Sequence, residues 1–108
     1  LIIRGVNVFP SQIESVLSEF DAFTPQYFIT VDRIDNEDTF DLDVELREDY
    51  FSPNPAKQMY FIKPLYDRLV SVCGIKPNIH ILPPGNIQRS MGKAKHVNDK
   101  RTHLIDWK

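Results

Sequence analysis

The clearest hydrophobic pattern of the chain is a strict alternation across residues 40–47, where apolar and charged or polar side chains take turns. A period of two is typical of a β-strand with one buried face and one face in water. The preceding residues 26–34 are rich in β-branched and aromatic side chains, which also favour a strand. Because only the polar residues 35–38 separate the two runs, the sequence predicts an antiparallel hairpin.

A first helix is predicted near the N-terminus. Apolar side chains recur at helical spacing from Ile13 to Phe20, which is typical of a helix that buries one face. Ser11 precedes this run and Glu14 follows three residues later, the arrangement of a capping box in which two side chains satisfy free backbone donors. We therefore expect a helix that begins at Ser11 and ends near Phe20.

A second, longer helix is predicted from the apolar positions between Met59 and Val72. Pro64 lies inside this run, so the helix either kinks there or restarts with Pro64 in its first turn. Gly74 stands just beyond the run, where a residue of left-handed conformation commonly ends a helix.

Three further segments complete the pattern. Residues 2–9 predict a short strand that contains Gly5, and residues 79–81 predict another that is stopped by a Pro-Pro-Gly sequence. A short helix or strand is expected around residues 97–101. The order strand, helix, strand, strand, helix, strand predicts an α+β fold. We expect a two-layer sandwich with both helices on one face of a mainly antiparallel sheet, followed by a basic C-terminal segment.

Composition changes this picture mainly through the distribution of charge. The chain has 108 residues, 26% of them charged, and a net charge of −2, which fits one small domain and excludes a two-domain enzyme. Residues 1–85 carry 7 basic and 13 acidic side chains, whereas residues 86–108 carry 6 basic and 2 acidic ones. The acidic body and basic tail indicate either a solvated surface or a tail that meets phosphate groups.

Other features of the sequence bear on the cellular compartment of the protein and on whether the chain is part of a longer one. Its one cysteine, Cys73, cannot form an internal disulfide, which favours a reducing cytoplasm. No apolar run approaches the roughly 20 residues of a membrane span, and no signal segment is recognisable. We therefore expect a cytoplasmic protein with no membrane partner. The sequence begins without Met inside an apolar run, so we expect residues 1–108 to be one domain cut from a longer chain.

Patterns for catalysis and metal binding are weak when each is taken alone. Ser90, His96 and Asp99 lie close in the sequence, but a hydrolase triad is defined by geometry that sequence does not supply. The three histidines match no known spacing of metal ligands, so we expect no metal site. Gly5 marks either a bulge or a close approach by a ligand or another backbone. Lys93 follows a glycine in a basic segment and suits oxyanions, although the earlier glycine of a P-loop is missing.

Two segments at opposite ends of the chain are more specific when taken together. Residues 1–14 read LIIRGVNVFPSQIE, and residues 82–95 read LPPGNIQRSMGKAK. In this order they resemble the C-terminal domain of phenylacetate-CoA ligases, which belong to the adenylate-forming superfamily, and the resemblance spans nearly the whole chain. Two positions depart from the family pattern: Met91, where a polar or acidic residue is usual, and His96, where Arg is common.

The resemblance implies one domain of a larger enzyme that uses ATP, Mg²⁺ and CoA. Such enzymes convert a carboxylate and ATP to an acyl-adenylate and pyrophosphate, and then pass the acyl group to the thiol of CoA. Their C-terminal domain swivels between the two half-reactions. The large N-terminal domain of the same chain carries the ATP, Mg²⁺ and aryl-acid sites, so we expect the 108 residues alone to bind no cofactor and to be inactive.

The resemblance also implies roles for individual residues. Lys93 matches the catalytic lysine that reaches the substrate carboxylate and the α-phosphate during adenylation. Gly5, with Arg4 and Val6, matches the loop whose backbone approaches the pantetheine arm of CoA. Candidates for contacts with CoA phosphates or with the large domain are Arg89, Lys95 and Lys100.

Two other functions share the predicted order of elements. An RNA recognition motif has the same order, but its sheet presents aromatic and basic side chains, whereas this chain presents Asp41, Asp43 and Glu45, which would repel phosphate. We therefore expect no nucleic-acid partner. A small regulatory or dimerising ferredoxin-like module is the other alternative, and a dimer of this piece could be an artefact of excision that exposes a normally covered face.

Overall fold

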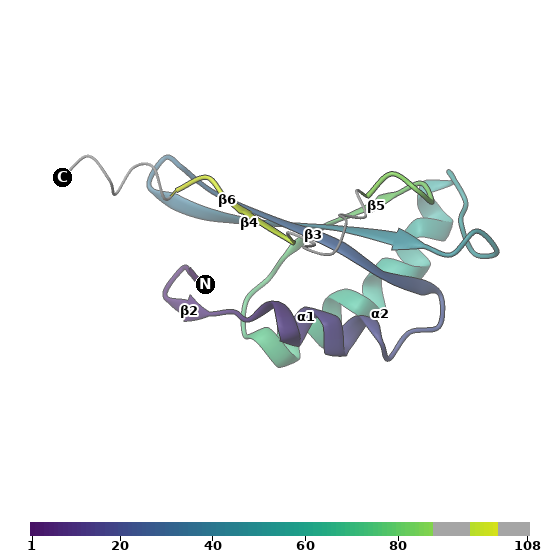
Figure 1. Ribbon diagram of the computed structural model, residues 1–108, viewed down its shortest axis with the longest axis horizontal. Helices are drawn as coiled ribbons and strands as arrows, with labels where there is room; N and C mark the ends of the chain where they lie inside the picture. The colour runs from purple at the N-terminus through teal and green to yellow at the C-terminus, as the bar shows by residue number, and fades with distance from the viewer. Residues whose placement is uncertain (88–95, 102–108) are drawn as a thin grey trace.

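The structure is a computed structural model that describes residues 1–87 and 96–101. Two helices pack on one face of a four-stranded sheet, and a small N-terminal hairpin lies on the same side (Figure 1). The elements in chain order are β1 (Ile2–Ile3), β2 (Val6–Asn7), α1 (Pro10–Leu17), β3 (Phe23–Ile34), β4 (Glu37–Leu46), α2 (Pro55–Cys73), β5 (Asn78–Leu82) and β6 (Val97–Asp99). The predicted α+β class and the placement of the helices are confirmed. Within the described part, neither helix is long and apolar enough to cross a membrane.

The main sheet is mixed, whereas a mainly antiparallel one was expected. Its strand order is β5-β4-β3-β6; the central pair β3 and β4 is antiparallel, and each edge strand lies parallel to its neighbour. Parallel neighbours need a crossover of a dozen or more residues, and α2 supplies one between β4 and β5. The expectation failed because sequence order alone does not determine which edge a returning strand joins.

The predicted central hairpin is present and carries the core. Asp35 and Asn36 turn the chain with φ of 53° and 67°, which suits a two-residue turn between antiparallel strands. The apolar positions of β4, including Phe40, Leu42 and Val44, are fully buried under the helices. The alternation therefore identified the buried apolar face correctly, but Glu45, expected on the face in water, is fully buried.

Helix α1 begins one residue earlier than predicted and is capped differently. Phe9 precedes it, and the side chain of Gln12 accepts a hydrogen bond from the Phe9 amide at 2.9 Å. The predicted capping box of Ser11 and Glu14 is wrong, because Pro10 already has helical geometry and displaces the helix start. Glu14 instead accepts a hydrogen bond from Tyr27 on β3 at 2.7 Å.

Helix α2 runs through Pro64 without a restart. The Asn54 side chain accepts a hydrogen bond from the Ala56 amide at 2.9 Å, which caps the first turn. Gly74 ends the helix with φ of 78°, as predicted. Only the second half of the helix has fully buried side chains, and Met59, expected on the buried stripe, is 56% exposed.

The predicted first strand is in fact a hairpin outside the main sheet. Among the described residues, strands β1 and β2 pair only with each other, with Ile2 opposite Asn7 and Ile3 opposite Val6. Ile3 and the following Val8 are fully buried, so the hairpin base is anchored in the core. The turn between the two strands, which carries Gly5, is left at the edge of the molecule.

Candidate functional site

The turn at Arg4 and Gly5, called the Gly5 turn below, has a backbone suited to close approach by a ligand. Both residues have positive φ, 51° for Arg4 and 77° for Gly5, which is the geometry of a tight two-residue hairpin turn. A Cβ built on Gly5 would meet no atom within 4 Å, so the space beside its backbone is open. The adjacent open hollow, of about 650 Å³, is lined by Arg4, Gly5, Arg33, Asn36, Glu37 and Asp38.

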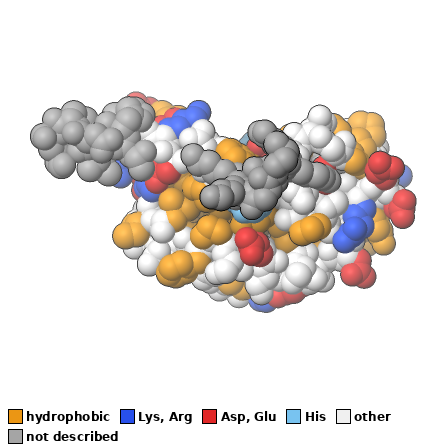
Figure 2. All heavy atoms as spheres, in the orientation of Figure 1, with side chains coloured by type: hydrophobic (Ala, Val, Ile, Leu, Met, Phe, Trp, Pro, Cys, Tyr) orange, Lys and Arg blue, Asp and Glu red, His pale blue; other side chains and the backbone are white. Residues whose placement is uncertain are grey.

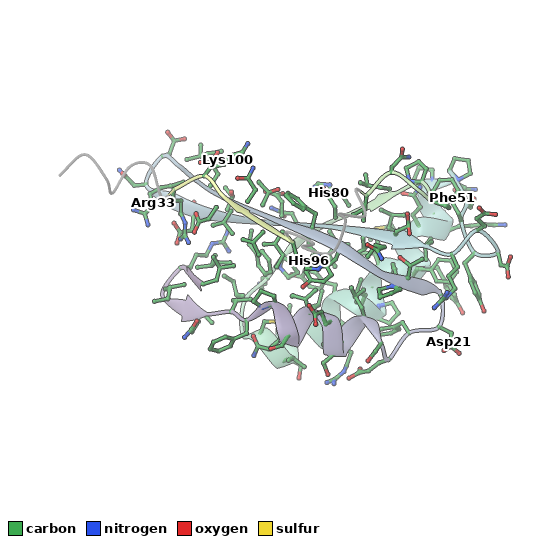
Figure 3. The ribbon with its side chains drawn as sticks, viewed as in Figure 1. Asp21, Arg33, Phe51, His80, His96 and Lys100 are labelled. Carbon is green, nitrogen blue, oxygen red and sulfur yellow. The ribbon has the colours of Figure 1, made fainter. Side chains whose placement is uncertain are left out.

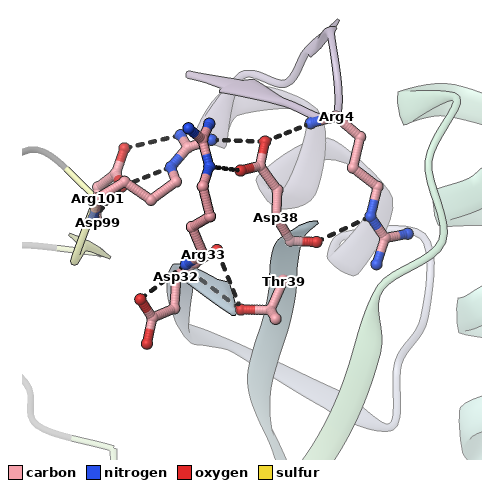
Figure 4. A network of polar contacts seen from close by, with 7 residues as sticks. All are labelled: Arg4, Asp32, Arg33, Asp38, Thr39, Asp99 and Arg101. Atoms are coloured by element: carbon pink, nitrogen blue, oxygen red, sulfur yellow. Dashed lines mark hydrogen bonds and ion pairs between the residues drawn. The ribbon is translucent and has the colours of Figure 1, made fainter. Parts of the chain in front are cut away.

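Asp38, the second residue of β4, holds the Gly5 turn against the sheet (Figure 4). The Arg4 backbone amide donates to Asp38 Oδ2 at 2.7 Å, and Arg4 Nε donates to the Asp38 carbonyl oxygen at 2.9 Å. One residue of the turn is thus bound at two points by one residue of the sheet. Because each bond constrains a different part of Arg4, the orientation of the turn is defined as well as its distance from the sheet.

The Asp38 carboxylate also receives two side chains from the sheet. Arg33, directly opposite on β3, donates to Oδ1 at 3.0 Å, and Arg101 donates to Oδ2 at 2.8 Å. Arg101 follows β6 and is itself bound by Asp99 through Nε and Nη2, each at 2.9 Å. The carboxylate therefore joins the Gly5 turn, the central hairpin and the C-terminal strand, all at a site where it is only 8% exposed.

These donors favour the ionised form of Asp38. The hydrogen bond from the Arg4 amide, with those from Arg33 and Arg101, lowers the pKa of Asp38 to about 2, although burial acts in the opposite direction. The Arg101 guanidinium likewise holds the pKa of Asp99 below its usual value. Both carboxylates are therefore charged across the physiological pH range.

We expect the free energy of unfolding of the 108-residue chain to fall in acid in a way that depends on Asp38. Its pKa is lower in the folded state, so its contribution is complete above the unfolded value and is lost as pH falls through about 2. At about pH 6, Asp38→Asn should destabilise the chain by about 1–3 kcal/mol, and this difference should shrink as pH approaches about 2. Denaturant unfolding at several pH values measures it; a difference independent of pH would contradict the assignment.

The described residues on either side of the segment that carries Lys93 are bound to the sheet. Arg89, Lys93 and Lys95 lie within residues 88–95, outside the described residues. Before this segment, the Gly85 amide donates a hydrogen bond to the fully buried Glu45 carboxylate on β4. After it, His96 resumes the described chain.

His96 is held on β3 by Tyr27. The two rings stack with centroids 4.2 Å apart, and His96 Nδ1 lies 3.2 Å from the Tyr27 carbonyl oxygen. The His96 carbonyl accepts the Ile29 amide at 2.7 Å, which begins the β6 pairing. Burial and the neighbouring Glu14 carboxylate raise the pKa of Tyr27, so its hydroxyl stays a donor to Glu14. His96 thus occupies a place fixed by β3 and α1, three residues beyond Lys93.

A comparison with known protein families identifies the chain. Residues 5–101 match the family described as AMP-binding enzyme C-terminal domain. The chain belongs to this family. The match begins at Gly5, one residue after Arg4, and takes in the central hairpin and Arg101, so the Asp38 network except Arg4 lies within the matched residues.

Curated relatives and solved structures agree with this assignment. The phenylacetate-coenzyme A ligases of Escherichia coli strain K12 and Pseudomonas putida are 39% and 38% identical over 94% of this chain. The chain spans only 23% of the length of each of these two relatives. A domain of phenylacetate-coenzyme A ligase from Bacteroides vulgatus aligns with a TM-score of 0.82 at 27% identity, covering 93% of this chain and 91% of that one.

A second solved structure represents a named reaction state. 2-Hydroxyisobutyryl-CoA ligase, in complex with 2-HIB-AMP and CoA in the thioesterification state, aligns with a TM-score of 0.86 at 25% identity. The alignment covers 99% of this chain and 23% of that ligase. The fold described above is therefore that of the corresponding part of a full-length CoA ligase.

In this AMP-binding C-terminal domain, the predicted site residues fall into two groups. Arg4, Gly5 and Val6 lie together on the N-terminal hairpin. Lys100 follows β6, where its amide donates to the Val31 carbonyl oxygen at 2.8 Å, and Figure 3 places its side chain near the end of the sheet that carries Arg33. The other predicted cations lie outside the described residues.

Sequence reasoning missed Asp38 and Arg101. The sequence pattern places Asp38 in a polar connection and distinguishes Arg101 from no other basic residue of the tail. The two are 63 positions apart in the chain, and neither belongs to a motif that would have drawn attention to it. In the structure Asp38 lies opposite Arg33, which is a favourable cross-strand pair, but the expected connection over residues 35–38 did not contain this pairing.

Proposed function

We propose that this chain is the C-terminal, swivelling domain of a phenylacetate-CoA ligase-like enzyme whose large N-terminal domain belongs to the same polypeptide. The observation that carries the proposal is the 39% identity to a phenylacetate-coenzyme A ligase over 94% of the chain. The full enzyme would convert an aryl carboxylate and ATP to an acyl-adenylate and pyrophosphate. It would then transfer the acyl group to the sulfur of CoA, with release of AMP.

Lys93 is the residue proposed to act in the first half-reaction. Its ammonium group would offset negative charge as the carboxylate and the α-phosphate approach each other, and no proton transfer is needed. The described residues on either side support this role, because Gly85 is bound to Glu45 and His96 stacks on Tyr27. An electrostatic catalyst requires well-held supporting residues of this kind.

The Gly5 turn is proposed to act in the second half-reaction. With Arg4 and Val6, Gly5 would line the path of the pantetheine arm, and the thiol would pass close to its backbone. The open space beside Gly5 supports this role, since a side chain there would take up that space. Lys100, and with it Arg89 and Lys95, would contact CoA phosphates or the large domain.

The large N-terminal domain is the proposed partner of the hairpin surface. Figure 2 shows hydrophobic side chains gathered where β2 and α1 lie, and Ile2 on β1 and Phe9, which follows the hairpin, are 59% and 49% exposed. Apolar side chains of this size next to a functional turn suit a surface that another domain covers in one of its states. We propose that ATP and Mg²⁺ bind mainly to that large domain and that the enzyme acts in the cytoplasm.

The alternative functions receive no support from the relatives. On the uncovered face of the sheet, Asp41 lies 3.1 Å from His80, and Asp43 is next to this pair, which makes a poor surface for nucleic-acid phosphates. A regulatory or dimerising module would not account for the match to CoA ligases.

The test is the activity of the full-length protein. We expect formation of phenylacetyl-CoA and AMP from phenylacetate, ATP and CoA in the presence of Mg²⁺. Chromatography of the products measures both. The 108-residue chain alone should give neither product. A panel of other aryl and alkyl carboxylates would define the substrate. Release of ADP in place of AMP, or full activity of the isolated chain, would overturn the proposal.

A further inference from the structure

The Gly5 turn depends on one residue of the main sheet for its position. The strands that flank it are two residues long each and, within residues 1–87 and 96–101, pair only with each other in a sheet of their own. The polar contacts from the turn residues to the main sheet that are described go from Arg4 to Asp38: the amide to Oδ2 at 2.7 Å and Nε to the carbonyl oxygen at 2.9 Å. A two-residue ribbon cannot hold its own tip rigidly, so Asp38 supplies the restraint.

Contacts other than those with the Gly5 turn also hold the Asp38 side chain in place. Arg33 binds one carboxylate oxygen, Arg101 binds the other, and Asp99 holds the Arg101 guanidinium through two atoms (Figure 4). Asp38 and Arg101 side chains are only 8% and 11% exposed. These contacts fix the rotamer of the Asp38 side chain. The direction of the Oδ2 lone pairs then determines where the Arg4 amide lies.

The network also joins the two ends of the chain. Arg101 follows β6, the strand that begins just after the Lys93 segment, and Arg4 belongs to the hairpin that precedes α1. Through their contacts with Asp38, the Gly5 turn and the residue that follows β6 are connected to each other.

We propose that Asp38 is a positioning residue for thioester formation, which acts by holding the Gly5 turn in the orientation that admits the CoA thiol. This inference rests on the proposed function. Asp38 contacts neither the acyl group nor the thiol in this role; it acts through the Arg4 backbone. Its loss should therefore affect the half-reaction that uses the turn and leave adenylate formation nearly unchanged.

The decisive variant is Asp38→Asn in the full-length enzyme. Asn keeps the size of the side chain but replaces one acceptor oxygen with an amide donor, which would face one of the arginine donors or the Arg4 amide. We expect kcat for transfer from supplied phenylacetyl-adenylate to CoA to fall about 10- to 100-fold, as for a displacement of about 1 Å. Pyrophosphate exchange should change by less than about twofold, because Lys93 lies on another segment.

The matched control is Glu19→Gln, which disturbs a carboxylate–arginine pair away from the hairpin. Glu19, two residues beyond α1, accepts from Arg68 at 2.8 and 2.7 Å and links the segment after α1 to α2. It should leave both half-reactions unchanged. A second variant, Arg101→Lys, keeps the charge but loses the two-point bond to Asp99; it should show the same selective loss to a smaller extent. This variant keeps the test available if Asp38→Asn does not fold.

The outcomes separate this inference from the proposed function. Selective loss of thioester formation in both variants supports it. Equal loss in both half-reactions, or no loss, would overturn it, and in either case a selective defect of Gly5→Val would leave the proposed function standing. Absence of acyl transfer to CoA in the unmodified full-length enzyme would overturn the proposed function and this inference together.

Discussion

Replacement of Lys93 by Ala in the full-length enzyme is expected to slow adenylate formation by about 10²- to 10³-fold, the usual cost of removing one preorganised electrostatic group from a reacting oxyanion. The loss should appear in kcat of pyrophosphate exchange, because the ammonium acts where the two anions meet and not on ATP binding alone. Transfer from supplied phenylacetyl-adenylate to CoA should be nearly unaffected, since under the proposed function the domain would by then have swivelled away from this pose.

Lys63→Ala is the matched control for Lys93. Lys63 is a lysine on α2 whose side chain is 76% exposed and lies 3.8 Å from Asp67, so its removal takes away one positive charge and a weak surface pair. Both half-reactions should proceed as in the unmodified enzyme. If Lys93→Ala slows the two half-reactions equally, or behaves like Lys63→Ala, Lys93 has no specific role in adenylation.

Replacement of Gly5 by Val should produce the second largest defect, in the opposite half-reaction. A β-branched residue at φ of 77° is strained by about 1–2 kcal/mol or more, and its side chain would enter the open space beside the turn. We expect transfer of the acyl group to CoA to fall by about 10- to 100-fold, while pyrophosphate exchange is retained. The apparent KM for CoA should rise as well, because the side chain would block the proposed path of the pantetheine arm.

Two controls separate strain from obstruction. Gly74→Ala imposes a similar backbone cost, because Gly74 has φ of 78° and a Cβ there would lie at an ordinary 3.8 Å from Val6. It should lower stability without a selective effect on the CoA step. Gly5→Asn accepts the left-handed conformation better than Val and still adds a side chain, so it should retain most of the CoA defect. A CoA step that tolerates both Gly5 variants would exclude the proposed role.

Local patterns predicted much of the fold because their causes are local. The alternation in residues 40–47 follows from one face of β4 being buried, and any register that exposed Phe40 would expose the whole apolar set. Gly74 ends α2 because a left-handed residue is favourable there only for glycine, whatever surrounds it. Such features need few contacts from distant parts of the chain.

Other features could not be predicted because distant segments decide them. Residues 2–9 have the composition of one strand, and their division into β1, the Gly5 turn and β2 depends on Ile3 and Val8 both reaching the core. Glu14 has the spacing of a capping residue, but Tyr27 offers it a buried partner on β3. The parallel edges of the sheet depend on where β5 and β6 return after long connections.

By itself, the sequence determined the α+β class, the buried apolar face of the central hairpin and the two segments that mark an AMP-binding C-terminal domain. Each of these features depends on residues that are close together in the chain. Only the tertiary structure decided that Arg4, Asp38 and Arg101 meet. A carboxylate selects its partners by position in space, and strand pairing brought together donors that lie 34 and 63 positions away from Asp38. The contacts that support the Gly5 turn therefore depend on the folded sheet, and no sequence motif encodes them.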